Sequence, residues 1–146
     1  MFETTLLDLA ECRAALAAML LAAQGLVRQP LAFAVVNDYG ELMAFARMDG
    51  ATPAVRELAI KKAYTSARMR ADLKDFRAGL EQRGRNVTDY ADPDLVGMAA
   101  GGIVIRDQES SVVLGGIGVS GGTPDEDEKI ARAGLLAFQT AGDRPT

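Results

Sequence analysis

The stretch VVLGGIGVSGGTPDEDEKIARAGLL, residues 112–136, contains a strand pattern, a glycine-rich segment and a helix start in succession. Residues 112–119 predict a β-strand, because valine, leucine and isoleucine dominate them. We interpret the glycines as places where a neighbouring helix or strand lies close, or where the strand bulges. Residues 123–126 match a capping box with acids in the first turn. A final helix is therefore expected to follow, with its inward side formed by Ile130, Ala131, Leu135 and Phe138.

Residues 116–121 of this stretch also match G-x-G-x-x-G, the dinucleotide-binding fingerprint. In that fingerprint the pyrophosphate lies at the start of the following helix. Here that helix opens with four acids in a row, residues 125–128, which would repel phosphate. We therefore expect neither NAD nor ATP to bind.

A second motif, G-x-S-x-G, spans residues 118–122. A Ser-His-Asp triad cannot use it, because the sequence contains no histidine. A lysine could replace the histidine as base, and Lys62 is the candidate. The lack of histidine also removes the usual nitrogen ligand of zinc and of haem iron, so no metal site is predicted.

The composition excludes several classes of protein. The chain has 146 residues and a net charge of −4, without a basic cluster, which argues against nucleic-acid binding. Its one cysteine, Cys12, allows no internal disulfide and favours a reducing compartment. The longest apolar run, residues 14–23, is too short to cross a bilayer, and the first residues lack the positive charge of a signal peptide. We expect a cytoplasmic protein that does not contact membranes.

The N-terminal part predicts a long helix over residues 5–25, capped by Thr4 or Thr5 and ended by Gly25. From residue 14 to residue 23 this helix is apolar on every side. Such a helix is usually buried on more than one face. Either a partner subunit covers it, which predicts a homo-oligomer formed through this helix, or its alanines tolerate water.

The middle of the chain predicts a hairpin of strands 31–37 and 41–48. Thr52 and Pro53 start a helix that runs to about Arg70, and a shorter helix follows and stops at Gly84. Residues 103–106 predict another strand. The order of elements predicts a single α+β domain over residues 1–146, with a loose tail from about residue 142.

Four segments together resemble the GlcG/HbpS-like family, to which the C-terminal domain of PduO-type cobalamin adenosyltransferases also belongs. They are AVVNDYGELMAFARMDGA, LAIKKAYT, GGIVI and VLGGIGVSGGTPDEDEKIARAGL. The resemblance implies a profilin-like fold, with about five antiparallel strands flanked by helices, in symmetric oligomers. It also implies a ligand such as haem for some members, although here any haem would lack a histidine ligand.

Arg47 and Asp49 lie at the end of the second hairpin strand and raise two interpretations. In one, Asp49 and Gly50 form a turn and Arg47 extends into solvent. In the other, Arg47 binds a carboxylate through two parallel hydrogen bonds from its guanidinium group, and Lys62 adds a second positive charge. The ligand-binding residues predicted by the second interpretation are Arg47, Asp49, Gly50, Lys62, Gly118, Ser120, Gly121 and Gly122. An inward-facing Lys62 requires a partner, for which Asp49 and Asp127 are candidates.

Three functions follow from this site. The first is a small-molecule-binding protein with an anionic ligand, linked to the catabolism of small acids or to tetrapyrrole handling. The second is a cofactor-independent lyase, isomerase or hydrolase acting on a small carboxylate, in which Lys62, Asp49 or Tyr64 moves protons. The third is a structural partner in an assembly.

Overall fold

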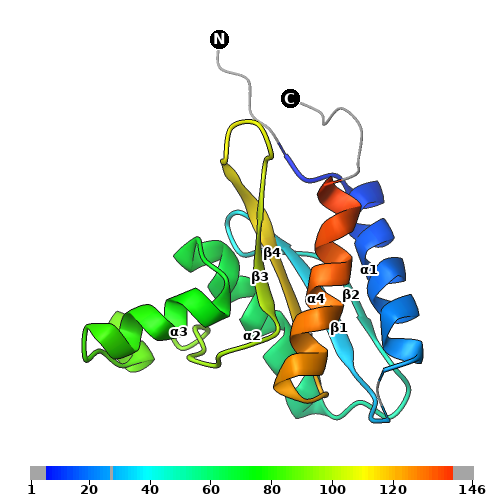
Figure 1. Cartoon of the computed structure of the whole chain (residues 1–146), viewed down its shortest axis with the longest axis horizontal. Helices are drawn as coiled ribbons and strands as arrows, with labels where there is room; N and C mark the ends of the chain where they lie inside the picture. The colour runs from blue at the N-terminus through cyan, green and yellow to red at the C-terminus, as the bar shows by residue number, and fades with distance from the viewer. Residues whose placement is uncertain (1–5, 27, 140–146) are drawn as a thin grey trace.

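The computed structural model describes residues 6–26 and 28–139. Four helices, one short 3-10 helix and four strands follow one another along this part of the chain (Figure 1). Their bounds are α1 Leu9–Gln24, β1 Ala32–Asn37, β2 Leu42–Arg47, α2 Pro53–Met69, α3 Leu73–Gln82, η1 Val87–Tyr90, β3 Gly102–Arg106, β4 Val113–Ser120 and α4 Pro124–Gln139.

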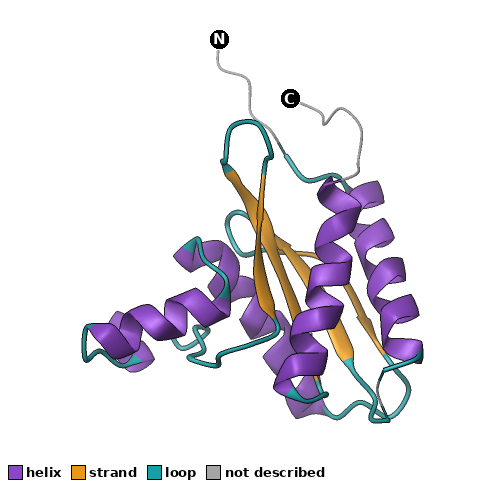
Figure 2. Cartoon of the chain, in the orientation of Figure 1, coloured by secondary structure: helices purple, strands orange, loops and turns teal. Residues whose placement is uncertain are grey.

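The strands form one antiparallel sheet in the order β2-β1-β4-β3. Helices cover both faces, with α1 and α4 side by side on one face and α2 on the other (Figure 2). The expected α+β class is therefore confirmed. The sheet has four strands, one fewer than the resemblance implied.

The two faces of the sheet carry side chains of different size, because successive residues of a strand point to opposite faces. Large residues face α1 and α4 and form the main core, among them Phe33, Val35, Ile103, Ile117 and Val119. Small residues face α2, where Ala32 and Ala34 of β1 pack with Ala59, Ala63 and Ala67 of the helix. Helix α2 can therefore lie close to the sheet.

Gly116 and Gly118 bring α2 closest to β4. A Cβ built on Gly118 would lie 1.9 Å from the Ala59 carbonyl oxygen, and one built on Gly116 would lie 2.3 Å from the Ala63 carbonyl oxygen. No side chain fits at either position without moving the helix backbone. Two of the three glycines of the apparent nucleotide motif, Gly116 and Gly118, therefore serve helix packing, which is one of the two roles we expected.

The predicted helix signals hold with one exception. Thr52 accepts a hydrogen bond from the Val55 amide at 3.3 Å, with Pro53 at the first helical position. Thr123 and Glu126 form the expected capping box at the start of α4. Helix α1, however, begins at Leu9, because Asp8 caps it by accepting from the Glu11 amide at 2.7 Å. Thr4 and Thr5, and the tail from residue 142, lie outside the described residues.

Within the described residues, no helix is both long enough and apolar enough to cross a membrane.

The contact between α2 and β4 gives a direct test. We expect Gly118→Ala to lower the free energy of unfolding by about 3 kcal/mol, because the added methyl group collides with helix backbone. Gly25→Ala is the matched control, since a Cβ there meets no described atom within 4 Å and its φ is −102°. Urea denaturation of both variants measures the effect. Equal midpoints for Gly118→Ala and the parent protein would contradict the packing role.

Candidate functional site

The predicted ligand-binding residues gather around one end of the sheet. At this end β1 begins, β2 and β4 end, and α2 and α4 start. Ala32 pairs with Arg47 on one side and with Ser120 on the other, so these three residues form one row across the sheet and share a face. Arg47 is exposed at the edge of this row, whereas Ser120 is buried.

Arg47 and Asp49 are both exposed. Among the residues that the structure describes, no hydrogen bond or ion pair joins either side chain to another group. Gly50 adopts a φ of +89°, as the turn interpretation requires. The Arg47 guanidinium is therefore available to a ligand.

The loop after β2 and the loop after β4 adjoin the same segment of chain. A Cβ built on Gly50 would lie 3.4 Å from Pro30 Cγ, and one built on Gly121 would lie 2.6 Å from the Pro30 carbonyl oxygen. Beside this segment is a cavity of about 340 Å³ lined by Leu26, Arg28, Gln29, Gly122, Thr123 and Glu126. Arg28 was not predicted as a site residue, because it lies in a loop that matches no motif.

Lys62 lies inside the protein, away from the exposed side chains of Arg47 and Asp49. Its ammonium group donates to the Val119 carbonyl oxygen at 2.8 Å and to Asp127 Oδ2 at 3.2 Å. The two side chains are 3% and 5% exposed. Of the two candidate partners, the structure thus selects Asp127, and Asp49 takes no part. The pair connects α2 to the start of α4 across the end of the sheet.

The acidic side chains at the start of α4 accept hydrogen bonds from backbone amides in and beside the glycine loop, where we expected an anionic ligand to bind. Asp127 Oδ1 accepts from the Gly122 amide at 3.0 Å, and Glu126 Oε1 accepts from the Thr123 amide at 2.9 Å. Glu128 Oε1 accepts from the Gly101 amide at 3.0 Å. The glycine loop therefore forms a wall of the site, and its amides at 122 and 123 are not free for a ligand.

Burial raises the pKa of the Asp127 carboxyl above its ordinary value of 3.8. The Lys62 ammonium and the Gly122 amide oppose this shift, because both favour the carboxylate. Lys62 is thus the group that contributes most to lowering the pKa of Asp127 against the effect of burial.

Tyr64, the third candidate for proton transfer, lies apart from Lys62. Its hydroxyl donates to Asp92 Oδ2 at 2.8 Å, and this hydrogen bond is the main cause that raises the pKa of Tyr64 above 10.0. It lines a different cavity of about 260 Å³, together with Glu57, Lys61 and Asp94. The structure therefore does not bring Lys62, Asp49 and Tyr64 together as one catalytic group.

At the Arg47 end, the described residues offer no donor for haem iron that is free of other contacts. Cys12 is fully buried in the main core. Met48, the methionine beside Arg47, accepts a hydrogen bond on its sulfur from the Leu31 amide at 3.4 Å. With no histidine in the sequence, the residues here do not fit a haem held through its iron.

Comparisons with known proteins identify the family. The family model described as haem degrading protein HbpS-like matches residues 7–136, so the chain belongs to the HbpS-like family, and the resemblance seen in the sequence is confirmed. A structure of a double mutant of HbpS from Streptomyces reticuli is 30% identical, with a TM-score of 0.79 over 94% of this chain and 90% of that one.

Two further relatives are informative. The structure of PduOC in complex with haem is 25% identical, with a TM-score of 0.79 over 90% of this chain and 94% of that one. A 15.0 kDa protein from the dhaT-dhaS intergenic region of Citrobacter freundii is 27% identical over 125 residues, which are 77% of this chain and 78% of the relative.

The buried pair predicts a pH-dependent stability. Lys62→Met should lower the free energy of unfolding at pH 8 by about 3 to 5 kcal/mol, because it leaves the Asp127 carboxylate buried without its cation. Lys61→Met is the matched control, since Lys61 is half-buried and takes part in no ion pair of the described residues. We expect it to change stability by about 0.5 kcal/mol or less.

Without Lys62 the pKa of Asp127 should rise further. Between the unfolded and folded pKa values, the folded protein holds a proton that the unfolded chain has lost, so stability falls as the pH rises. The deficit of Lys62→Met relative to the parent protein should therefore grow from pH 4 to pH 8, as measured by denaturation at each pH. A deficit that shrinks over this range would show that Asp127 does not depend on Lys62.

Proposed function

We propose that this HbpS-like protein binds a small anionic organic molecule at the end of the sheet near the loops of residues 47–50 and 118–122. The observation that carries the proposal is the exposed guanidinium of Arg47 at the end of β2, together with a second exposed arginine, Arg28, which lines the cavity of about 340 Å³ at the same end of the sheet. Neither guanidinium has a charged partner among the described residues. Guanidinium groups recognise carboxylates through paired hydrogen bonds.

The distribution of charge at this end of the sheet favours binding of the ligand by the exposed arginines. Lys62 is committed to Asp127, and the first-turn acids Glu126 and Asp127 accept hydrogen bonds from amides of the loop before α4. The buried charges are thus largely compensated within the protein. The exposed guanidinium of Arg47 or Arg28 would attract a carboxylate, and the cavity walls formed by Leu26 and Gly122 would contact the rest of the molecule.

A tetrapyrrole is one ligand of this class, and the complex of PduOC with haem supports it. Because the donors near Arg47 do not fit iron ligation, a tetrapyrrole would be held here by its carboxylates. A small acid from a catabolic pathway is the other ligand that we propose. A thermal-shift screen against small carboxylates and haemin, with absorption spectra for haemin, would separate them.

The alternative is a cofactor-independent enzyme that acts on a small carboxylate. It would use Arg47 to anchor the substrate and Asp49 to move a proton. The structure offers less support for this alternative, since Lys62 is buried in an ion pair and Tyr64 is bound to Asp92. Turnover of the acids that stabilise the protein in the screen would favour it.

We also propose that the chain assembles through α1. Four leucines on α1, on the segment that follows it and on its neighbour α4 are about half exposed or more: Leu9 at 56%, Leu21 at 72%, Leu26 at 48% and Leu136 at 57%. A self-complementary apolar surface usually forms a closed symmetric oligomer.

Leu21→Glu tests this assembly, because it places a charge at the most exposed of these four leucines. We expect light scattering at micromolar concentration to show an oligomer for the parent protein and a smaller species for the variant. Met98→Glu, at a residue 39% exposed in the loop before β3, is the matched control and should leave the mass unchanged. A monomeric parent protein would overturn the proposal.

Arg47→Lys tests the ligand site. It should leave the melting temperature almost unchanged, since Arg47 is exposed and has no partner in the described structure. It should weaken binding of haemin or of the acid found in the screen roughly a hundredfold, or about 2 to 3 kcal/mol. Lysine keeps the positive charge but cannot make two parallel hydrogen bonds to one carboxylate.

Arg85→Lys, an exposed arginine just beyond α3, serves as the control for this substitution and should bind as the parent protein does. If Arg47→Lys melts much lower and binds normally, Arg47 belongs to a turn and the ligand lies elsewhere.

A further inference from the structure

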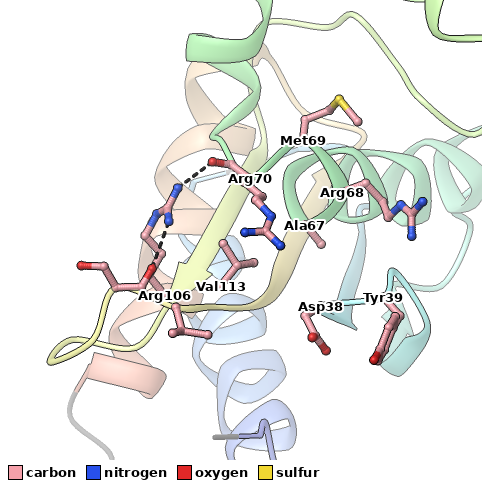
Figure 3. A pocket seen from close by; sticks show the side chains of 10 residues that line it. Asp38, Tyr39, Ala67, Arg68, Met69, Arg70, Arg106 and Val113 are labelled. Carbon is pink, nitrogen blue, oxygen red and sulfur yellow. Dashed lines mark hydrogen bonds between the residues drawn. The ribbon is translucent and has the colours of Figure 1, made fainter. Parts of the chain in front are cut away.

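The opposite end of the sheet holds a second cavity, of about 510 Å³, which the sequence patterns did not indicate (Figure 3). The turn between β1 and β2 lines one side of it, the C-terminal end of α2 lines another, and the ends of the β3–β4 hairpin complete it. The lining residues are Asp38, Tyr39, Ala67, Arg68, Met69, Arg70, Arg106, Ser111, Val112 and Val113.

Three arginines meet around this cavity. Arg68 and Arg70 come from the end of α2, and Arg106 comes from the end of β3. Their one acidic neighbour in the lining is Asp38. None of the three forms an ion pair with a described residue.

The Arg106 side chain is held in place by the backbone. It donates to the Arg70 carbonyl oxygen at 2.6 Å and to the Ser111 carbonyl oxygen at 3.1 Å (Figure 3). Both acceptors are neutral, so they fix the guanidinium without cancelling its charge. The Arg68 guanidinium has no such hydrogen bond in the described structure, and its central carbon lies 5.8 Å from the centre of the Tyr64 ring, a cation–π contact.

Arg70 reaches the cavity through a left-handed backbone conformation. Its φ is +56° at the C-cap of α2, a position that glycine usually occupies. Here the residue is an arginine instead, and its side chain extends between Arg106 and Arg68 (Figure 3). Ser111 across the cavity also has a positive φ, of +63°. Both conformations belong to local structure, the C-cap of α2 and the turn of the β3–β4 hairpin, and they set where the two residues line the cavity.

We propose that this cavity binds an anion with two or more carboxylates. Three guanidiniums from two elements can contact separate carboxylates of one molecule, and the Tyr39 hydroxyl can add a neutral hydrogen bond. A molecule with one carboxylate would use only part of this set. The site is independent of the ligand site proposed at the Arg47 end, because the two lie at opposite ends of the sheet.

Two sources could supply such carboxylates, a free tricarboxylic acid or the carboxylates of a tetrapyrrole. Citrate and haemin are therefore the two probes, titrated separately by calorimetry and by absorption. Succinate and acetate complete the charge series. We expect affinity to rise from acetate through succinate to citrate, because each added carboxylate finds a further guanidinium.

Arg70→Gly is the decisive variant. Glycine adopts a φ of +56° without strain, so the variant should melt at the temperature of the parent protein or above it. It removes one guanidinium, so binding of at least one probe should weaken about tenfold or more. Arg56→Ala is the matched control, since Arg56 is an exposed arginine in the first turns of the same helix, and it should bind both probes as the parent protein does.

The proposal is overturned if neither probe binds saturably, if Arg70→Gly binds both as the parent protein does, or if Arg56→Ala weakens binding equally. Arg47→Lys distinguishes the two sites. A loss caused by Arg70→Gly but not by Arg47→Lys places the probe in the arginine cavity. A loss caused by Arg47→Lys but not by Arg70→Gly supports the Arg47 site and overturns the proposal of a site in the arginine cavity.

Discussion

The close approach of α2 to β4 is the constraint on which the rest of the structure depends. Gly116 and Gly118 let the helix backbone lie against the strand, with the Ala59 carbonyl oxygen where a Cβ would otherwise be. At this depth Lys62 cannot reach solvent, so its ammonium requires internal acceptors. The Val119 carbonyl and Asp127 supply them, and the ion pair fixes the start of α4 relative to α2. Two glycines thus determine how helices on opposite faces of the sheet are joined.

This arrangement also explains the run of acids from residue 125 to residue 128. Glu126 closes the capping box, Asp127 receives Lys62 and the Gly122 amide, and Glu128 receives the Gly101 amide. In an anion-binding loop, amides of this kind would contact the ligand. Here carboxylates of the protein take that place. Recognition of an anion must therefore come from side chains outside the loop, and the exposed guanidiniums are the groups available for it.

Local signals in the sequence predicted the helices and strands well. They did not predict which residues from distant segments contact one another. The cap and proline at residues 52–53, the capping box at 123–126 and the hairpin each depend on a few neighbouring residues, and all three form as predicted. The partner of Lys62 was left between Asp49 and Asp127, because sequence periodicity fixes the face of a helix and not the element opposite. The arginine cavity was missed for the same reason, since its residues come from three distant segments that are each ordinary.

The two ends of the sheet differ in how their charges are arranged. At the end where α4 starts, acids and Lys62 neutralise one another inside the protein, and the positive charge that remains is on the rim at Arg28 and Arg47. At the other end, Arg68, Arg70 and Arg106 surround a cavity with one carboxylate among them. An uncompensated charge beside a cavity contributes little to stability and can contribute strongly to binding, because a ligand removes water from it. Arg106 also joins the end of α2 to the β3–β4 hairpin through its two backbone acceptors, whereas the side chains of Arg28, Arg47 and Arg70 form no such bond in the described structure, and recognition of anions is the role that we propose for them.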